Sequence, residues 1–497
     1  MTMLRTCNRL ISFIKILVFT FVFTDLYSQD VEEYIQQEQP YGQFCPVEEP
    51  STFDPPLLLD IPTAINIALT SHRSLAAALE NVYKAQLNVE LADSEFALRI
   101  NPRSDIGYVG GGKAGLGGTI GGGLDLTQKF SVGTFVGINP YITKDAHDYH
   151  SGVKAIIRQP LLRGFGSEYT LSPLYGAQFA SRTAFRTAYI TGMETILRII
   201  TILYDVAKLE ELVTLDQEAH ERLKKFRESI KIKARIGLAD SLDVYRVETE
   251  MKHTEDALDS SRERLLDAKD ALREFLALPL DKNISIRLPI DYQPLDVDVD
   301  AAIQTALTCR MEIEQAKDQL CESRRLSRVA QNNILPDLNL VLDFTNTGRD
   351  EVFTNSFTDK RDSRWGVGFT TASDWDRTAQ KVAFTQSLFN INNAERNLDQ
   401  TQDKIILEIK RAIRQMHRAN QKIELQREQI RNAMGELKLA KLKFERGRAN
   451  NFDVIQAEKN LRSSETAFLN AIVDHKIGEY KLYASLGLLA DKPEFCP

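Results

Sequence analysis

The sequence predicts a mainly α-helical protein with a smaller β portion suited to a membrane, built from a unit that occurs twice. Residues 231–251 and 441–461 share seven identities at a constant offset of 210 positions. Long proline-free runs with a seven-residue apolar spacing surround both copies, and stretches that alternate apolar with small or polar residues precede them. We therefore expect a duplicated unit with the order helix, β-hairpin and long helical hairpin.

The chain begins with the pattern of an export signal. Residues 1–28 carry two early arginines and then an apolar run, which is typical of a secretory signal peptide. Residues 29–58 contain five prolines on an acidic background and are expected to form an extended N-terminal tail. Beyond residue 30 no window supplies the ~18 consecutive apolar residues of a spanning helix, so the exported chain is either soluble or crosses a membrane as strands.

The net charge bears on possible partners, and the cysteine positions bear on possible disulfides. The net charge of −7 gives no reason to expect a nucleic-acid partner. Cys309 and Cys321 lie twelve residues apart on one expected helix, roughly 18 Å, which is too far for a disulfide. Cys45 and Cys496 lie in the two tails, and an oxidising compartment would allow them to pair or leave them free.

Repeat 1 is expected at 59–288 and repeat 2 at 289–490, followed by a C-terminal tail at 491–497. In repeat 1, Asp60, Pro62 and Thr63 open a helix that runs towards Pro102. The segment 302–316 matches 64–78 in six of fifteen positions and opens the second copy. The expected β segments are about 104–160 and about 337–389, and the hairpin tips about 236–242 and about 446–452.

Each β segment has one apolar face. Leu338, Leu340, Leu342 and Phe344 alternate with small or polar residues, as a sheet needs when lipid wets one side and water the other. Two strands from each copy make four, too few to close a membrane barrel, so the strands must be shared with sister chains. Trp365, Trp375 and Tyr141 suit a membrane aromatic belt or the core of an end cap. The alternative is a small soluble sheet packed on its own helices.

Long helices follow each β segment. In the second copy Ile409, Met416, Ile423, Ile430, Leu437 and Phe444 repeat every seven residues, which predicts supercoiled packing with a neighbour. Each descending helix is expected to run for ~50 residues, on the order of 75 Å. Glycine and small polar residues at each tip allow the chain to turn back.

At this point the order of elements resembles a known family. The ILPDLNL step at 334–340, the QPLLRG exit at 159–164 and the paired Gly-x-x-x-x-x-Asp-Val tips are similar to the TolC-like outer-membrane efflux channels, over roughly residues 59–490. The resemblance implies a homotrimer in the outer membrane of a Gram-negative-type bacterium. It implies a twelve-stranded β-barrel in contact with outer-membrane lipid and continuing into a periplasmic α-helical barrel, with most of the mass in the periplasm.

The resemblance also implies partners and a role. A periplasmic adaptor and an inner-membrane transporter would dock on the channel, which would be a passive gated conduit of a tripartite efflux or type I secretion system. It would export small molecules or proteins across the periplasm and outer membrane. The competing class is a secreted structural or adhesive coiled-coil protein without a pore, which gains nothing from strands with one apolar face.

Family roles carry over onto the tips. By resemblance, the adaptor-contacting turns are Gly237, Leu238, Ala239, Gly447, Arg448 and Ala449. Asp453 takes the place of the acidic ring that narrows the closed end, and Gln456 stands where the family pattern has a second acid. Asp243 matches a latch residue that pairs with a basic group on the other tip; the strict equivalent of that group here is Ala449, and Arg448 beside it is the expected partner. A second reading of Asp243 and Asp453 is that each simply caps a helix after a turn.

No residue set points to catalysis. The sequence has no Ser/His/Asp or Cys/His arrangement, no phosphate-binding loop and no clustered carboxylate pair, so we expect neither an enzyme nor a cofactor. His147 and His150 have a spacing that could bind a metal, but a solvated loop is the simpler interpretation, and no metal site is expected. His220 falls on the apolar phase of its helix and is expected in the seam.

Overall fold

A computed structural model gives the structure of residues 57–489, apart from 111–115, 146, 238, 296, 359–360 and 373–375. These residues belong to one unit, Pro56–Pro497. The expected signal peptide, most of the N-terminal tail, the tail at 491–497 and the cysteines Cys45 and Cys496 lie outside the described residues.

Each repeat opens with two helices where one was expected. These are α2 (Ile61–Ser71) and α3 (Arg73–Ser94) in the first copy, and α7 (Val299–Cys309) and α8 (Met311–Asn332) in the second. The backbone is extended at His72 (ψ 119°) and at Arg310 (ψ 126°). Neither break carries a proline or glycine, which explains why the sequence pattern did not reveal it. Cys309 and Cys321 therefore lie on different helices, both as free thiols.

The first helix begins as predicted. The Asp60 carboxylate accepts a hydrogen bond from the Thr63 amide at 2.9 Å, and Pro62 occupies the first turn of α2. Asp298 caps α7 in the same way, through the Ala301 amide at 3.2 Å.

The strands form one antiparallel sheet in the order β2-β3-β4-β5-β7-β8. Their bounds are β2 Arg99–Gly110, β3 Leu116–Lys129, β4 Phe135–Lys144, β5 Tyr149–Pro160, β7 Asn339–Asp350 and β8 Asp362–Thr370. The expectation of two strands from each copy is wrong for the first copy, which supplies four. Glycines occupy several positions of β3 and hide the alternation from which strands are recognised.

Both β segments have bounds that differ from the expected ones. The first begins at Arg99 rather than near residue 104, and Pro102 lies inside β2, an edge strand that tolerates a missing N–H group. The second ends at Thr370, because α10 begins at Thr378 and already contains residues 378–389. Short helices α4 (Ser167–Thr170) and α9 (Phe353–Thr358) follow β5 and β7.

Two helical hairpins extend from the sheet. They are α5 (Ser172–Arg235) with α6 (Ser241–Phe275), and α10 (Thr378–Glu445) with α11 (Asn451–Leu486). The 64 residues of α5 span about 96 Å, longer than expected from the sequence. The seven-residue spacing is confirmed as the packing seam, since Ile409, Met416, Ile423 and Leu437 are all buried.

A two-stranded parallel sheet joins the start of repeat 1 to its last residues, just before the boundary with repeat 2. It pairs β1 (Leu57–Leu59) with β6 (Ile284–Ile286). Leu59 is fully buried in the largest hydrophobic cluster, which also holds residues of α2, α5, α6 and α11. This cluster lies where the short and long helices meet, partway along α5.

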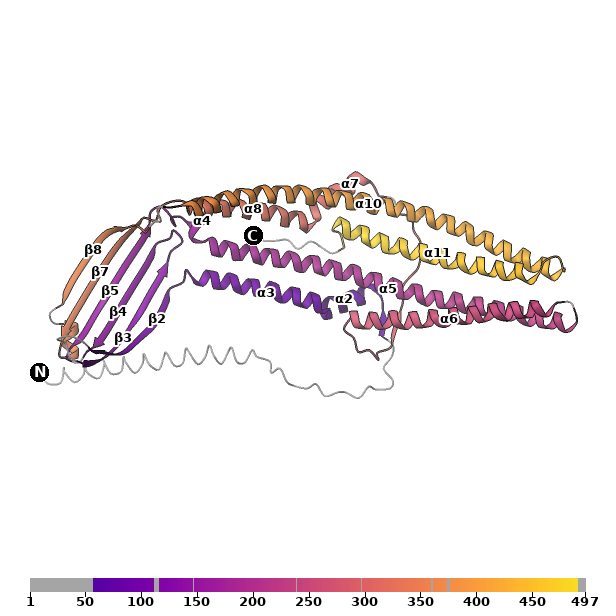
Figure 1. Cartoon of the computed structure of the whole chain (residues 1–497), viewed down its shortest axis with the longest axis horizontal. Helices are drawn as coiled ribbons and strands as arrows, with labels where there is room; N and C mark the ends of the chain where they lie inside the picture. Colours follow the sequence, from indigo (N-terminus) through magenta and orange to yellow (C-terminus); the bar gives the residue numbers. More distant parts are fainter. Residues whose placement is uncertain are drawn as a thin grey trace. The chain divides into compact units, whose positions relative to one another are not determined.

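Figure 1 shows the strands at one end of this unit and the turns between the long helices at the other. Within the described part of the chain, none of the helices has the length and apolar character needed to span a membrane. Trp365 is 78% exposed on the same face of the sheet as Leu342 and Phe344, whereas Tyr141 lies on the opposite face beneath the Lys154 ammonium group. Of the three residues expected in an aromatic belt or an end cap, Trp365 is exposed on the apolar face, Tyr141 lies on the opposite face, and Trp375 lies outside the described residues.

Candidate functional site at the helical tips

The two hairpin tips have the same backbone geometry. Gly237 follows α5 with φ +75°, and Gly447 follows α10 with φ +70°. Only glycine adopts this left-handed conformation without a steric penalty. No neighbouring atom lies within 4 Å of a Cβ built at either glycine, so the dihedral angle and not space requires the residue. The sequence identity at the tips therefore reflects a common turn.

The two aspartates that recur after the turns cap their helices. Asp453 Oδ2 accepts from the Asn450 amide at 3.1 Å, while Asn450 Oδ1 accepts from the Asp453 amide at 3.1 Å. Asp243 Oδ2 accepts a longer hydrogen bond, 3.4 Å, from the Asp240 amide. The capping interpretation of both residues thus holds in the structure, and any further role must be added to it.

The tip residues singled out in the sequence are mostly at the surface. Gly237, Gly447 and Arg448 are exposed, Ala239 and Ala449 are half-buried, and Leu238 lies outside the described residues. Asp453 and Gln456 are exposed on α11, on the side away from its buried residues Val454 and Ala457. The Gln456 side chain donates to Asn460 Oδ1 at 3.0 Å. A carboxylate and an amide therefore lie on an exposed stripe of α11.

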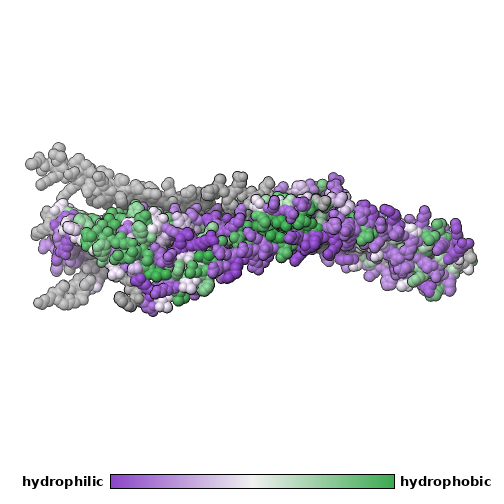
Figure 2. Space-filling view, turned by 90° about the horizontal axis from the view of Figure 1, so that it is seen from above, coloured by the Kyte–Doolittle hydropathy of each residue, from purple (hydrophilic) through white to green (hydrophobic). Residues whose placement is uncertain are grey.

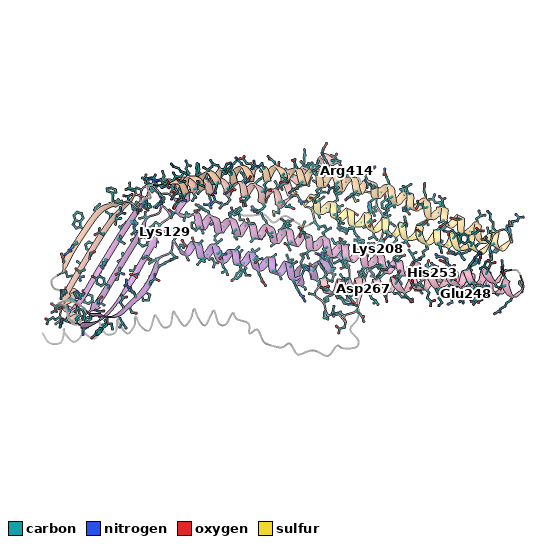
Figure 3. The ribbon with its side chains drawn as sticks, in the orientation of Figure 1. Lys129, Lys208, Glu248, His253, Asp267 and Arg414 are labelled. Atoms are coloured by element: carbon teal, nitrogen blue, oxygen red, sulfur yellow. The ribbon has the colours of Figure 1, made fainter. Side chains whose placement is uncertain are left out.

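The structure does not bring Asp243 and Arg448 together within one chain. The Asp243 carboxylate lies 3.9 Å from the Arg246 guanidinium group on its own helix. The Arg448 amide donates to the Lys443 carbonyl at 2.8 Å, and its side chain has no ion pair among the described residues. Figure 3 labels Glu248 near this tip, where its carboxylate pairs with Lys231 across the α5/α6 turn at 2.9 Å.

Other residues hold the two hairpins against each other. Asn451, the first residue of α11, is fully buried and its Nδ2 donates to the Asp243 carbonyl at 2.8 Å. Further along α11, Glu458 is only 4% exposed and receives two cations, Arg222 of α5 at 2.9 Å and Lys441 of α10 at 2.8 Å. Glu458 therefore joins both helical hairpins.

Two more ion pairs continue the series on α11. The Arg462 guanidinium lies 2.6 Å from the buried Asp216 carboxylate of α5, which also accepts from the Ser261 hydroxyl of α6 at 2.6 Å. Lys459 lies 2.7 Å from Glu250 of α6. We call these contacts the inter-hairpin network; its members are Asp216, Arg222, Glu250, Ser261, Lys441, Asn451, Glu458, Lys459 and Arg462.

Glu465, a further acidic residue beside this network, has a shifted pKa. Burial raises the pKa of Glu465, and the attraction of Arg222, 3.5 Å away, does not fully offset it. Sequence reasoning missed these residues, although a signal was present. Asp216, Glu250 and Glu458 each lie three or four residues after a seam residue, which puts a charge on the buried phase of the helix.

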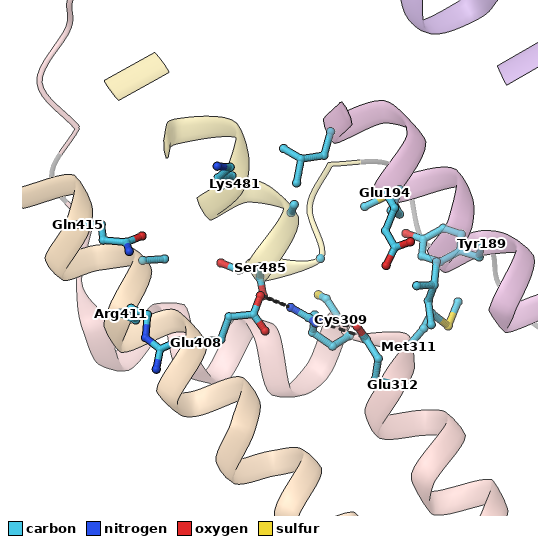
Figure 4. Close-up of a pocket in the computed structure, with 17 residues that line it drawn as sticks. Tyr189, Glu194, Cys309, Met311, Glu312, Glu408, Arg411, Gln415, Lys481 and Ser485 are labelled. Carbon is cyan, nitrogen blue, oxygen red and sulfur yellow. Dashed lines mark hydrogen bonds and ion pairs between the residues drawn. The ribbon is translucent and has the colours of Figure 1, made fainter. Parts of the chain in front are cut away.

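A cavity of about 400 Å³ lies between α5, α10, α11 and the break that separates α7 from α8. Figure 4 shows Glu408, Glu312 and Ser485 around this break. The Arg310 guanidinium pairs with Glu312 at 2.6 Å and Glu408 at 3.2 Å, and donates to the Ser485 carbonyl at 3.1 Å. These contacts hold Arg310, the extended residue between α7 and α8, in place. We therefore interpret the cavity as part of the packing between these helices and not as a ligand site.

His150 and His220, two of the histidines singled out in the sequence, have ordinary side-chain partners. His150 lies 2.9 Å from Asp145, and Asp148 pairs with Arg349 at 2.6 Å. His220 contacts the Thr254 hydroxyl at 3.3 Å across the α5/α6 seam. Among the described residues no group of three or more His, Cys, Asp and Glu side chains has a geometry that could hold a metal.

Comparison with known proteins connects this geometry to a family. Residues 302–488 match the model of the outer membrane efflux protein family. No curated protein matches the chain.

Several solved structures share the fold. CusC is similar with a TM-score of 0.69 at 13% identity, covering 88% of this chain and 95% of that one. CmeC, an outer membrane channel of Campylobacter jejuni, has a TM-score of 0.68 at 13% identity over 88% and 87%. VceC, an outer membrane protein of Vibrio cholerae, has a TM-score of 0.64 at 15% identity over 86% and 96%.

Proposed function

We propose that this chain is a TolC-like outer membrane efflux protein, on the basis of the family match over residues 302–488 and of its fold, and that three copies form a gated conduit. The strands cross the outer membrane and the helices extend through the periplasm. In this proposal the conduit is passive, as the resemblance to the family implies, and the inner-membrane transporter supplies the energy. It serves a tripartite efflux or type I secretion system that exports small molecules or proteins.

The observation that carries this proposal is the two-faced sheet at the end of long hairpins. On one face of β5, β7 and β8 lie Val153, Ala155, Ile157, Leu342, Phe344, Trp365 and Val367. On the other face lie Lys154, Arg158, Asp343 and Arg364. Strands with one apolar and one charged face suit lipid outside and water inside, and their open edges require a partner strand.

The tips are the proposed docking and gating end. The turns at Gly237–Ala239 and Gly447–Ala449 would contact a periplasmic adaptor, which links the channel to an inner-membrane transporter. Asp453, with Gln456 one turn further, would form a ring around the closed end in the trimer. Three carboxylates brought together repel anions and attract cations.

The gate has two proposed restraints. The inter-hairpin network restrains the hairpins within a chain, and Arg448 would pair with Asp243 of a neighbouring copy. On this basis Arg448→Ser is expected to raise the conductance of the closed channel several-fold, measured by single-channel recording. An unchanged closed-state conductance would remove Arg448 from the latch.

Reconstitution tests the function itself. The purified protein in planar bilayers is expected to give discrete, cation-preferring conductance, and chemical crosslinking in membranes is expected to capture a trimer. A well-folded, water-soluble monomer without channel activity would contradict the proposal and favour a structural coiled-coil protein.

A further inference from the structure

The first repeat contributes two strands more than the second, and both are long enough for a membrane. β2 has 12 residues and β3 has 14, while β8, the shortest strand of the sheet, has 9. A tilted strand needs about 9–11 residues to cross the hydrocarbon core. Length therefore gives no reason to separate the β2/β3 hairpin from the other strands.

The register continues one apolar face through this hairpin. Residues directly opposite each other in a ladder share a face. Ile100 pairs with Leu126 and Ile106 with Ile120, and Leu126 in turn pairs with Ile138 of β4. The same face then includes Ala155, Phe344 and Trp365 on the next three strands. Figure 2 shows hydrophobic residues gathered over the part of the surface that the strands form.

The opposite face of the hairpin is polar, like that of the neighbouring strands. On β2 it carries Asn101, Arg103 and Asp105, and the last two form an ion pair at 2.9 Å. On β3 it carries Asp125, whose carboxylate accepts from the Asn139 side chain of β4. A hairpin in water would need no such division, whereas a charge directed at lipid costs about 2–4 kcal/mol near the midplane.

The exposed edges of the sheet are β2 and β8. β2 starts at the helical end, directly after α3, and β8 finishes at the helical end, before α10. When β8 of one copy meets β2 of the next, the two strands run antiparallel, as do all neighbouring strands within this sheet. The six strands are thus an even-numbered, alternating segment that can be joined to copies of itself.

We propose that all six strands enter the wall, so that three copies close an eighteen-stranded barrel in which β2 of each copy pairs with β8 of the next. This inference rests on the proposed function and refines it. A twelve-stranded barrel would leave the β2/β3 hairpin outside the wall. Because barrel diameter grows roughly linearly with strand number, the membrane lumen would be about 1.5-fold wider than that of twelve strands at similar tilt.

Accessibility to a water-soluble maleimide tests where β2 lies. The four cysteines beyond the expected signal, Cys45, Cys309, Cys321 and Cys496, are first replaced by serine in the full-length protein, which is then reconstituted in liposomes. Ile106→Cys and Asp105→Cys report the two faces of β2. Phe344→Cys and Thr345→Cys are the matched control on β7.

In the proposed barrel, Ile106→Cys and Phe344→Cys react at least about tenfold more slowly than their polar-face neighbours. If both β2 cysteines react quickly while Phe344→Cys is protected, the hairpin lies in water and only the eighteen-stranded barrel is overturned. If Phe344→Cys is also unprotected, the membrane function itself fails.

Disulfide scanning identifies the strand that pairs with β8. Val367→Cys is combined in turn with a cysteine at the apolar-face positions of β2, which are 100, 102, 104, 106 and 108. The control set is 136, 138, 140 and 142 on β4, the edge strand of a twelve-stranded arrangement. Intersubunit disulfides are expected with β2 alone, and disulfides with β4 would refute the proposal.

Discussion

Asp453 has two roles to separate, as a cap of its own helix and as a member of the proposed acidic ring of the trimer. Its carboxylate caps α11, which needs only a hydrogen-bond acceptor, whereas the proposed ring needs its negative charge. The two properties can be separated because asparagine keeps an acceptor oxygen and removes the charge.

Asp453→Asn is expected to reduce the cation preference of the channel with little change in thermal stability. Asp453→Ala should reduce both, since losing the cap costs about 0.5–2 kcal/mol. Reversal potentials in a salt gradient and the melting temperature are the measurements. A cation preference that survives both substitutions would exclude Asp453 from the ring.

His475 is a buried titratable group of α11. It is fully buried, its ring meets that of Tyr292 edge-on at 5.0 Å, and neither ring nitrogen has a hydrogen-bond partner among the described residues. Burial lowers the pKa of His475, with Glu479 opposing and Lys476 assisting the shift. In the folded protein the imidazole therefore stays neutral at a pH where the unfolded chain is already protonated.

The sign of the pH effect follows from this difference. The stability contribution of neutral His475 is complete above the ordinary pKa of 6.5 and is lost progressively as the pH falls below it. His475→Phe, which keeps an aromatic ring against Tyr292, is expected to lose less stability between pH 7.5 and 5.5. Melting temperatures at the two pH values test this, and equal losses in both proteins would contradict it.

At the scale of elements, an apolar cluster and buried ion pairs both join the two helical hairpins near their tips. The tip cluster includes Val247 of α6, Leu437 of α10 and Leu461 of α11. Apolar packing is non-directional, whereas the ion pairs of the inter-hairpin network have defined partners. Separation of the hairpins would expose charges that water can solvate, so such contacts suit an interface that opens.

Glu458→Gln tests the network. The uncharged amide cannot form ion pairs with Arg222 and Lys441, and breaking a buried ion pair costs about 3–5 kcal/mol. The closed-state conductance is expected to rise. Glu255→Gln is the matched control, because Glu255 pairs at 2.6 Å with Lys252 on the exposed surface of α6. Equal conductance in the two variants would exclude the network as a restraint.

At the scale of the whole molecule, the β1/β6 pair joins the beginning of repeat 1 to its end, next to the boundary with repeat 2. Leu59 is fully buried and Leu58, its neighbour on the same strand, is 51% exposed. The cluster around Leu59 includes Ala68 of α2, Leu272 of α6 and Val473 of α11, so both repeats contribute to it.

Leu59→Ala is therefore expected to lower the free energy of unfolding by about 2–5 kcal/mol. Leu58→Ala should stay within about 0.5 kcal/mol of the parent protein, because its side chain is largely in solvent already. Thermal or denaturant unfolding measures both. Similar losses of unfolding free energy in the two variants would mean that the stability comes from the strand itself and not from the burial of Leu59 in the cluster.

The sequence by itself determined the features that depend on neighbouring residues. Gly237 and Gly447 mark the turns because a left-handed backbone favours glycine wherever it occurs. The heptads of α10 predict a helix with a packed seam because side chains seven apart return to one face. The paired tips revealed the duplication, since each copy meets the same local requirement.

Tertiary structure alone decided what depends on distant contacts. The four strands of the first copy are recognised only once Gly-rich β3 pairs with both neighbours, and the helix breaks at His72 and Arg310 carry no local signal. Glu458 finds Arg222 across 236 positions of sequence. The physical reason is that backbone preference acts within a few residues, whereas strand pairing and ion pairing join groups that only the folded chain brings together.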